Sequence, residues 1–209
     1  MRVGVLASGR GTNFDALALA QREPGFPARI VLLACDRPEA PVLAKAEGAG
    51  IPVLLFDPGT PRGAWTDRGV AALREGLAAS GVEAICLAGF MRIIPAEIVR
   101  AYAGRILNVH PALLPSFPGT HAQRKALDAG VKVTGCTVHL VDEGVDTGPI
   151  VMQAAVPVRE NDTEETLSAR ILEREHEIYP AALRALAEGR ILVEGRRARV
   201  CASRVAGER

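Results

Sequence analysis

The sequence predicts a doubly wound α/β fold whose sheet is mostly parallel, with an antiparallel extension towards the C-terminal end. Short apolar segments rich in Val, Ile and Leu alternate with segments of helical spacing over the first 130 residues. A glycine follows most of the helical segments, as expected where helices end. Beyond residue 130, two longer strand-like segments follow one another without an intervening helix, which indicates an antiparallel pair.

Each strand of the first half is assigned from a short apolar run, and each helix from apolar residues that recur every three or four positions. Val70, Leu73 and Leu77 have this spacing in a segment that stops before Gly81. The expected strands are 3–7, 30–35, 52–56, 84–88 and 106–109. The expected helices between them are 13–22, 41–47, 67–79 and 95–102.

The second half is expected to contain fewer helices. Its predicted elements are a helix at 122–129, strands at 133–141 and 150–158, a long helix ending near residue 188, and a hairpin of strands 191–193 and 199–201. Asp162 is expected to cap the long helix with Glu165 completing a capping box, and Pro180 to bend or break it. We therefore expect a main domain at residues 1–189, followed by a C-terminal hairpin and tail at 190–209.

The composition fits one globular domain without a membrane or nucleic-acid partner. With 209 residues, 48% of them hydrophobic, the chain can bury a substantial core. Its 25 basic and 24 acidic residues are mixed along the chain, which argues against nucleic acid or an acidic membrane as the main partner. No apolar run approaches about 18 residues, so we expect no transmembrane helix. Ser8 and Gly9 interrupt the first apolar run too early for a signal peptide.

The cysteines argue against a metal centre. They are dispersed along the chain, at Cys35, Cys86, Cys136 and Cys201. They form no Cys-x-x-Cys pair and have no histidine at ligand spacing, so we expect no zinc or other metal site. The first three lie in apolar, strand-like runs, which predicts buried, reduced thiols in a cytoplasmic protein.

An amide and an imidazole are close together in the segment Asn108-Val-His110-Pro111. Residues two apart on a strand point to the same face, and 106–109 is a predicted strand. Pro111 disfavours a helix at His110 and ends that strand. The two side chains are therefore expected at the carboxyl end of a strand, where open α/β sheets bind their ligands. Asp146, in a glycine-rich loop, could orient the imidazole and keep it charged.

These three residues suggest direct transfer of an acyl or formyl group between two substrates. A charged imidazole and an amide NH₂ both donate hydrogen bonds, and together they would stabilise the oxyanion of an attacked carbonyl. The imidazole can also move a proton, and a nearby carboxylate would raise its pKa. The motif contains no Ser or Cys nucleophile. A structural histidine at a strand end, with a loop aspartate capping a turn, would give the same pattern.

A second candidate site is the loop Ser8-Gly9-Arg10-Gly11-Thr12-Asn13, which connects the first strand and the first helix. Its glycines would let backbone N–H groups approach an anion, and the start of the following helix carries a positive dipole end. The loop lacks the Gly-Lys-Ser/Thr ending of a Walker A motif, and Phe14 stands at the third glycine of a dinucleotide fingerprint. A single phosphate is therefore the expected ligand; the alternative is a tight turn without a ligand.

Five segments together resemble the glycinamide ribonucleotide formyltransferase family. They are Gly9-x-Gly11-Thr12-Asn13, the Ala-Gly-Phe-Met-Arg-Ile-Ile run at 88–94, Asn108-x-His110-Pro111-x-Leu113-Leu114-Pro115, Pro118-Gly119, and Asp142-Glu143-x-x-Asp146-x-Gly148-Pro149. The likeness extends from the first strand to about Pro180. It implies a Rossmann-like formyltransferase fold with residues 1–189 as the catalytic domain. It also implies transfer of a formyl group from 10-formyltetrahydrofolate to the amine of glycinamide ribonucleotide in de novo purine biosynthesis.

The likeness also implies roles for the residues that match the family motifs. The implied catalytic residues are Asn108, His110 and Asp146. The residues implied to bind the ribonucleotide are Gly11, Thr12, Asn13 and Glu175. Those implied to bind the folate are Arg62, Met91, Arg92, Ile93, Ile94, Asn108, Asp142, Glu143, Gly144, Val145 and Asp146. The alternatives are a solvated helix position for Glu175 and ordinary core positions for Met91 and Ile93.

The implied mechanism uses 10-formyltetrahydrofolate as co-substrate, with no metal and no covalent enzyme intermediate. Other members of the wider superfamily share the trio. Methionyl-tRNA formyltransferase would add a C-terminal domain and a basic tRNA face. Formyltetrahydrofolate deformylase would add an N-terminal regulatory domain. We expect none of these features here. A non-catalytic folate- or phosphate-binding protein would keep the loop and the pocket without needing His110 and Asp146. The expected oligomeric state is a monomer or a homodimer.

Overall fold

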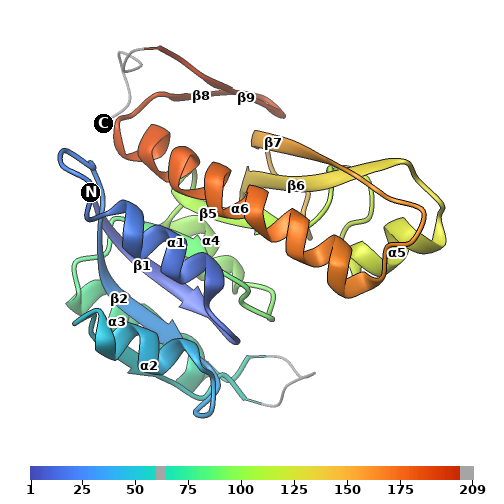
Figure 1. The fold of residues 1–209 in the computed structure, drawn as a ribbon. Coiled ribbons are helices and arrows are strands. Elements are labelled where there is room, and N and C mark those ends of the chain that lie inside the picture. Colours follow the sequence, from blue (N-terminus) through green and yellow to red (C-terminus); the bar gives the residue numbers. More distant parts are fainter. Residues whose placement is uncertain (60–64, 203–209) are drawn as a thin grey trace. The chain divides into compact units, whose positions relative to one another are not determined.

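The computed structural model describes residues 1–59 and 65–202 (Figure 1). The chain divides into two compact units, Met1–Ile106 and Leu107–Arg209. Each unit has its own strands and helices, and the two are described in turn. Among the described residues, no helix has both the length and the apolar character needed to cross a membrane.

The described residues of the first unit form four parallel strands in the order β3-β2-β1-β4. These strands are β1 (Arg2–Ala7), β2 (Arg29–Cys35), β3 (Val53–Leu55) and β4 (Ala84–Leu87). The helices are α1 (Thr12–Ala20), α2 (Val42–Gly48), α3 (Asp67–Ala79) and α4 (Ala96–Ala101). The chain first proceeds from β1 to β3 and then returns to the other side of β1. Right-handed crossovers therefore place α1 and α2 on one face and α3 on the other, which is a doubly wound arrangement.

The core of the first unit lies on both faces of these strands. Every residue of β4 is buried, as expected for a strand of a covered parallel sheet. Phe14 and Leu17 of α1 are fully buried, as are Leu73 and Leu77 of α3. The Thr66 hydroxyl accepts a hydrogen bond from a backbone N–H in the first turn of α3, which fixes where that helix begins.

The second unit contains strands in the order β5-β6-β7-β9-β8. They are β5 (Ile106–His110), β6 (Val133–Leu140), β7 (Ile150–Pro157), β8 (Ile191–Glu194) and β9 (Arg197–Val200). The β5–β6, β6–β7 and β8–β9 pairs are antiparallel. The helices are α5 (Ala122–Asp128) and α6 (Glu164–Ala187). The predicted fold class is confirmed, because parallel strands dominate the first half and antiparallel strands form the C-terminal extension.

The predicted cap of the long helix is wrong by one residue. Thr163 is the N-cap of α6, and Thr166 completes the capping box. Asp162 instead accepts hydrogen bonds from the Arg170 guanidinium and the Arg159 backbone N–H. Pro180 lies inside α6 and does not break it. The element boundaries otherwise agree with the predicted ones to within a few residues.

Three of the four cysteines are buried, as predicted, and all four are free thiols. Cys136 belongs to an apolar cluster in the second unit, in which α6 packs on β6 and β7. Burial is the main reason that the pKa of this thiol rises to about 12. A thiol with such a pKa stays protonated and serves as packing.

Candidate active site

Asn108, His110 and Asp146 meet in the second unit. Asn108 and His110 are two residues apart on β5 and both reach Asp146, which lies in the loop after β6. His110 Nδ1 is 3.3 Å from Asp146 Oδ2, and Asn108 Nδ2 is 3.5 Å from Asp146 Oδ1. Strand alternation therefore places the amide and the imidazole on one face, and the loop brings the carboxylate to both.

His139 is a fourth member of this cluster that the sequence reasoning did not include. The antiparallel register places it directly opposite Asn108. Its Nδ1 is 2.9 Å from the Leu140 carbonyl, which can only accept, so Nδ1 carries a proton. Its Nε2 lies 3.0 Å from Asn108 Nδ2 and 3.5 Å from Asp146 Oδ1. A neutral His139 accepts from Asn108 there, whereas a charged one donates to Asp146.

The His110 ring is held at both nitrogens. Nε2 lies 2.9 Å from the Phe117 carbonyl oxygen, and Nδ1 faces the Asp146 carboxylate. Phe117 and Asp146 both have positive φ, at 55° and 54°. Such backbone costs energy in residues other than glycine and is often found at functional sites. Both oxygen partners of His110 therefore come from strained positions.

Burial controls the charges of this cluster. It lowers the pKa of His110 below the ordinary value, and Asp146 and the Phe117 carbonyl only partly oppose this effect. Asp146 therefore raises the pKa of His110 as expected, but burial lowers it by more, so the net direction is downward. Burial raises the pKa of Asp146 itself, but hydrogen bonds from His139 and the Gly119 backbone, with the nearby imidazoles, bring it down to about 2.

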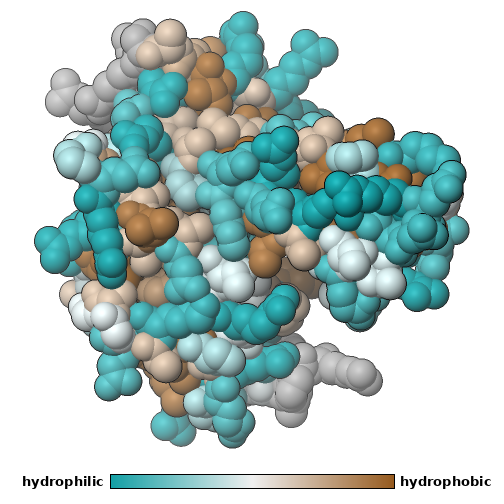
Figure 2. Space-filling model, in the orientation of Figure 1, coloured by the Kyte–Doolittle hydropathy of each residue, from teal (hydrophilic) through white to brown (hydrophobic). Residues whose placement is uncertain are grey.

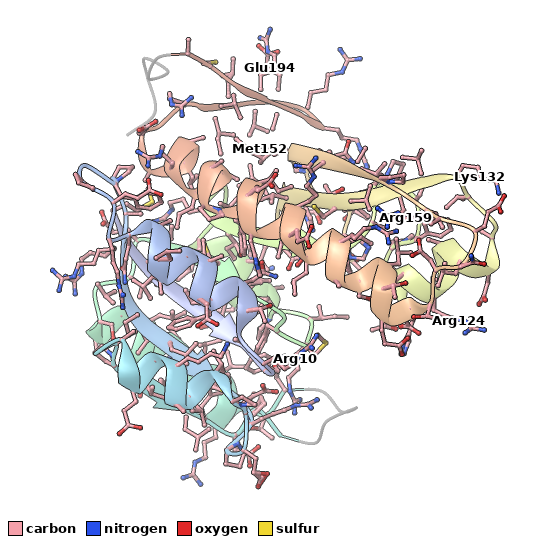
Figure 3. All side chains as sticks on the ribbon, viewed as in Figure 1. Arg10, Arg124, Lys132, Met152, Arg159 and Glu194 are labelled. Atoms are coloured by element: carbon pink, nitrogen blue, oxygen red, sulfur yellow. The ribbon has the colours of Figure 1, made fainter. Side chains whose placement is uncertain are left out.

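The predicted phosphate loop lies in the first unit, between β1 and α1. Gly11 is the N-cap of α1 and has a φ of 72°, so no side chain caps the first-turn N–H groups. A Cβ at Gly11 would lie 2.5 Å from Val42 Cγ2, whereas a Cβ at Gly9 would meet no atom within 4 Å. Gly11 is therefore required by the fold itself. Gly9 and the exposed Arg10 (Figure 3) are open to a ligand.

The predicted folate segment follows β4 in the same unit. Met91 and Ile93 are 62% and 67% exposed, so they are not ordinary core residues, whereas Ile94 is buried. The Arg92 side chain points inward to the Asp36 carboxylate, with Nε 2.9 Å from Oδ2. Its predicted contact with the folate would therefore have to come from its backbone.

Phe90 of the matched 88–94 run belongs to a cluster of three aromatic rings, and the sequence reasoning did not single out the other two, Phe56 and Trp65. Phe56 and Trp65 stack with ring centroids 5.8 Å apart, and Phe90 lies within 6.5 Å of both. The Trp65 indole N–H donates to the Ile93 carbonyl at 2.9 Å. Aromatic residues make up only 4% of the chain, and their separation in sequence hides this cluster.

The remaining predicted residues differ in how the structure places them. Arg62 lies outside the described residues. The loop containing Asp142, Glu143, Gly144 and Val145 is closed by the Asp142 carboxylate, which accepts from the Gly144 N–H and the Thr147 hydroxyl. Within residues 1–59 and 65–202, no cluster of three His, Cys, Asp or Glu residues could hold a metal ion.

Glu175 lies on the buried face of α6. It continues a stripe with four-residue spacing formed by Leu167, Ile171 and Tyr179, and all four are buried. Hydrophilic side chains cover the outward face of the same helix (Figure 2). A carboxylate in an apolar stripe is not the solvated helix residue considered as the alternative.

Comparison with known proteins gives consistent likenesses over nearly the whole chain. The Formyl transferase family matches residues 1–183. The crystal structure of glycinamide ribonucleotide transformylase 1 from Symbiobacterium toebii is 51% identical with a TM-score of 0.91, over 96% of this chain and 94% of that one. The phosphoribosylglycinamide formyltransferase of Bacillus subtilis is 44% identical, over 88% of this chain and 94% of its own length.

Other likenesses are partial or more distant. The trifunctional purine biosynthetic protein adenosine-3 of Gallus gallus is 47% identical over 96% of this chain, which spans only 20% of that protein. A formyltetrahydrofolate deformylase from Pseudomonas syringae has a TM-score of 0.88 but 26% identity, over 96% of this chain and 65% of that one. Because the family match covers most of its residues, this chain belongs to the formyl transferase family.

Proposed function

We propose that this chain is a phosphoribosylglycinamide formyltransferase, which transfers the formyl group of 10-formyltetrahydrofolate to the amine of glycinamide ribonucleotide. The observation that carries the proposal is the convergence of Asn108, His110 and Asp146, with His139 completing the hydrogen bonds. The two full-length likenesses, to a transformylase and a formyltransferase named for this substrate, support the choice of acceptor. The reaction belongs to de novo purine biosynthesis in the cytoplasm.

The chemistry is a direct exchange of one C–N bond for another. The acceptor amine attacks the formyl carbon and forms a tetrahedral oxyanion. The C–N bond to the folate then breaks, and the proton lost by the amine passes through water to the departing folate nitrogen. The side chains of the cluster stabilise the oxyanion by hydrogen bonding, which is commonly the largest contribution to acyl-transfer catalysis.

The resting contacts of His110 and Asn108 specify how these donors act. His110 Nε2 exchanges the Phe117 carbonyl for the oxyanion, while Nδ1 keeps its contact with Asp146. The developing negative charge favours the charged ring and so counteracts the effect of burial. The Asn108 amide donates to the same oxyanion when it exchanges one of its resting partners, His139 or Asp146.

Each unit carries residues with proposed ligand-binding roles. In the first unit, Gly11, Thr12, Asn13 and the open Gly9 hold the substrate phosphate, and the segment containing Met91, Ile93 and Ile94 binds the folate. In the second unit, Glu175 binds the glycinamide end and the Asp142–Asp146 loop contacts the folate. Residues 1–189 form the catalytic domain in this proposal.

The proposed acceptor is tested by consumption of 10-formyltetrahydrofolate with and without glycinamide ribonucleotide. We expect consumption only when the ribonucleotide is present, with one formylated product per folate consumed. Equal consumption in its absence would identify a deformylase-like hydrolase instead. Binding of both ligands without any consumption would contradict an enzymatic role and favour a binding protein.

The phosphate loop is tested by Gly9→Val, because the space around this position is open. We expect the ribonucleotide to bind at least about tenfold more weakly, since a branched side chain blocks close backbone approach to the phosphate. Calorimetry should show nearly unchanged folate binding. Gly25→Val would add the same bulk at another open turn of the unit. It is not a suitable control, because Gly25 has a φ of 78° and a side chain there would strain the backbone. Gly48→Val adds the same bulk at an open position without positive φ and serves as the control. Equal weakening of both ligands by Gly9→Val would contradict the assignment of this loop to the phosphate.

A further inference from the structure

The backbone at and just before the proposed folate segment, residues 91–94, is held at residues 89, 91 and 93 by groups from elsewhere in the unit. Ser8 donates its backbone N–H to the Gly89 carbonyl at 3.2 Å. The Ser8 hydroxyl accepts from the Met91 N–H at 3.1 Å. Trp65 donates to the Ile93 carbonyl at 2.9 Å. The segment thus presents exposed Met91 and Ile93 side chains on an ordered backbone.

A single carboxylate connects these contacts. Asp36, directly after β2, accepts from the Ser8 hydroxyl at 2.6 Å through Oδ1. Its other oxygen, Oδ2, accepts from Arg92 Nε at 2.9 Å. The Ser8 hydroxyl has one proton, and giving it to Asp36 leaves a lone pair directed to the Met91 N–H. Asp36 therefore orients the Met91 backbone N–H through the Ser8 hydroxyl. It orients the Arg92 side chain directly, through the ion pair.

This network is shielded from water and lies where ligands bind in such folds. The exposed fraction of the side chain is 3% for Asp36 and 10% for Arg92, so their attraction is weakly screened. Ser8, Asp36 and Gly89 follow the carboxyl ends of β1, β2 and β4. The strand order reverses at β1, which makes this the topological switch point of the unit.

We propose that Asp36 is a positioning residue, which holds the folate-binding segment in its binding conformation through Ser8 and Arg92. The assignment of the segment to folate rests on the proposed function. Asp36 itself touches no reacting atom. Its loss should therefore weaken folate binding in ground state and transition state alike, which raises KM and leaves kcat nearly unchanged.

The test is Asp36→Asn, which keeps the shape but removes the charge. We expect the KM for 10-formyltetrahydrofolate to rise roughly tenfold, as for loss of a charge-assisted hydrogen bond, with kcat within about threefold of the original. The matched control is Glu97→Gln, which removes a carboxylate from an exposed pair with Arg74 in the same unit. The control should change neither constant, and an unchanged folate KM in Asp36→Asn would overturn the proposal.

A second variant separates positioning from simple loss of stability. Asp36→Asn leaves the Arg92 charge without its buried partner, so the protein can be destabilised. The double variant Asp36→Asn/Arg92→Gln removes both charges and should recover the melting temperature. Positioning predicts that its folate KM stays raised. Recovery of both the melting temperature and the KM would show a purely structural role and contradict the proposal.

A readout that needs no substrate distinguishes failure of this inference from failure of the proposed function. Trp65 is the single tryptophan of the chain and is hydrogen-bonded to the segment. In Asp36→Asn its emission should shift to longer wavelength and its quenching by acrylamide should increase. If this fluorescence change is found but the unsubstituted protein transfers no formyl group, the Asp36 network is supported and the proposed function is rejected. Unchanged fluorescence beside normal formyl transfer would reject the network and leave the function standing.

Discussion

Replacing His110 with alanine is expected to lower kcat by about 10²–10³, the usual effect of losing one oxyanion donor. Asn108→Ala should act in the same direction, because the two donors lie on one face of β5 and share Asp146. The measurement is steady-state formyl transfer with both substrates saturating. Near-normal turnover in either variant would exclude the proposed oxyanion site.

The His110 variant should also lose some stability. The side chain is buried, and its removal takes away the ring that contacts the Phe117 carbonyl and the Asp146 carboxylate. We expect a decrease of about 1–3 kcal/mol in the free energy of unfolding. Gln153→Ala is the matched control, since Gln153 donates to the Leu114 carbonyl and the Thr137 hydroxyl in the same unit. It should lose stability without the large loss of kcat.

Replacing Asp146 with asparagine is expected to lower the pKa of His110 still further. Burial already lowers this pKa, and Asp146 is the main group that opposes the effect. The negative charge of the carboxylate raises the pKa of the nearby imidazole, so its removal should lower that pKa. At any given pH the charged fraction of the ring then falls. Activity that needs the charged ring should fall most at high pH, which shifts the pH–rate profile to lower pH.

The shift can be measured by NMR titration of His110 beside pH–rate profiles, once His121, His139 and His176 are assigned. Asp142→Asn is the control for the titration, because it removes another carboxylate of the same loop whose hydrogen bonds go to Gly144 and Thr147. That variant should leave the His110 pKa unchanged. An unchanged or higher His110 pKa in Asp146→Asn would limit Asp146 to shaping the loop.

The sequence could predict features that depend on short stretches of chain. Periodicity alone located the strands and helices, because buried residues recur every two positions along a strand and every three to four positions along a helix. Alternation along β5 also placed Asn108 and His110 on one face. Local reasoning could not give the exact cap of α6, since Asp162 and Thr163 are both good capping residues and only the folded chain shows Asp162 bonded to Arg170.

Features that depend on how distant segments pair were settled only by the tertiary structure. His139 joins Asn108 because of the β5–β6 register, and Asp36 meets Arg92 because the carboxyl ends of β2 and β4 lie near each other. The direction of the His110 pKa was likewise decided by burial, which a local motif does not reveal. The sequence by itself determined the elements, the fold class and the choice of proposed reactive groups, because these follow from local chemistry and spacing. The hydrogen-bond partners of the side chains, the burial of charged groups and the directions of the pKa shifts could be found only from the folded chain. Desolvation and cross-strand contacts arise only when distant residues are brought together.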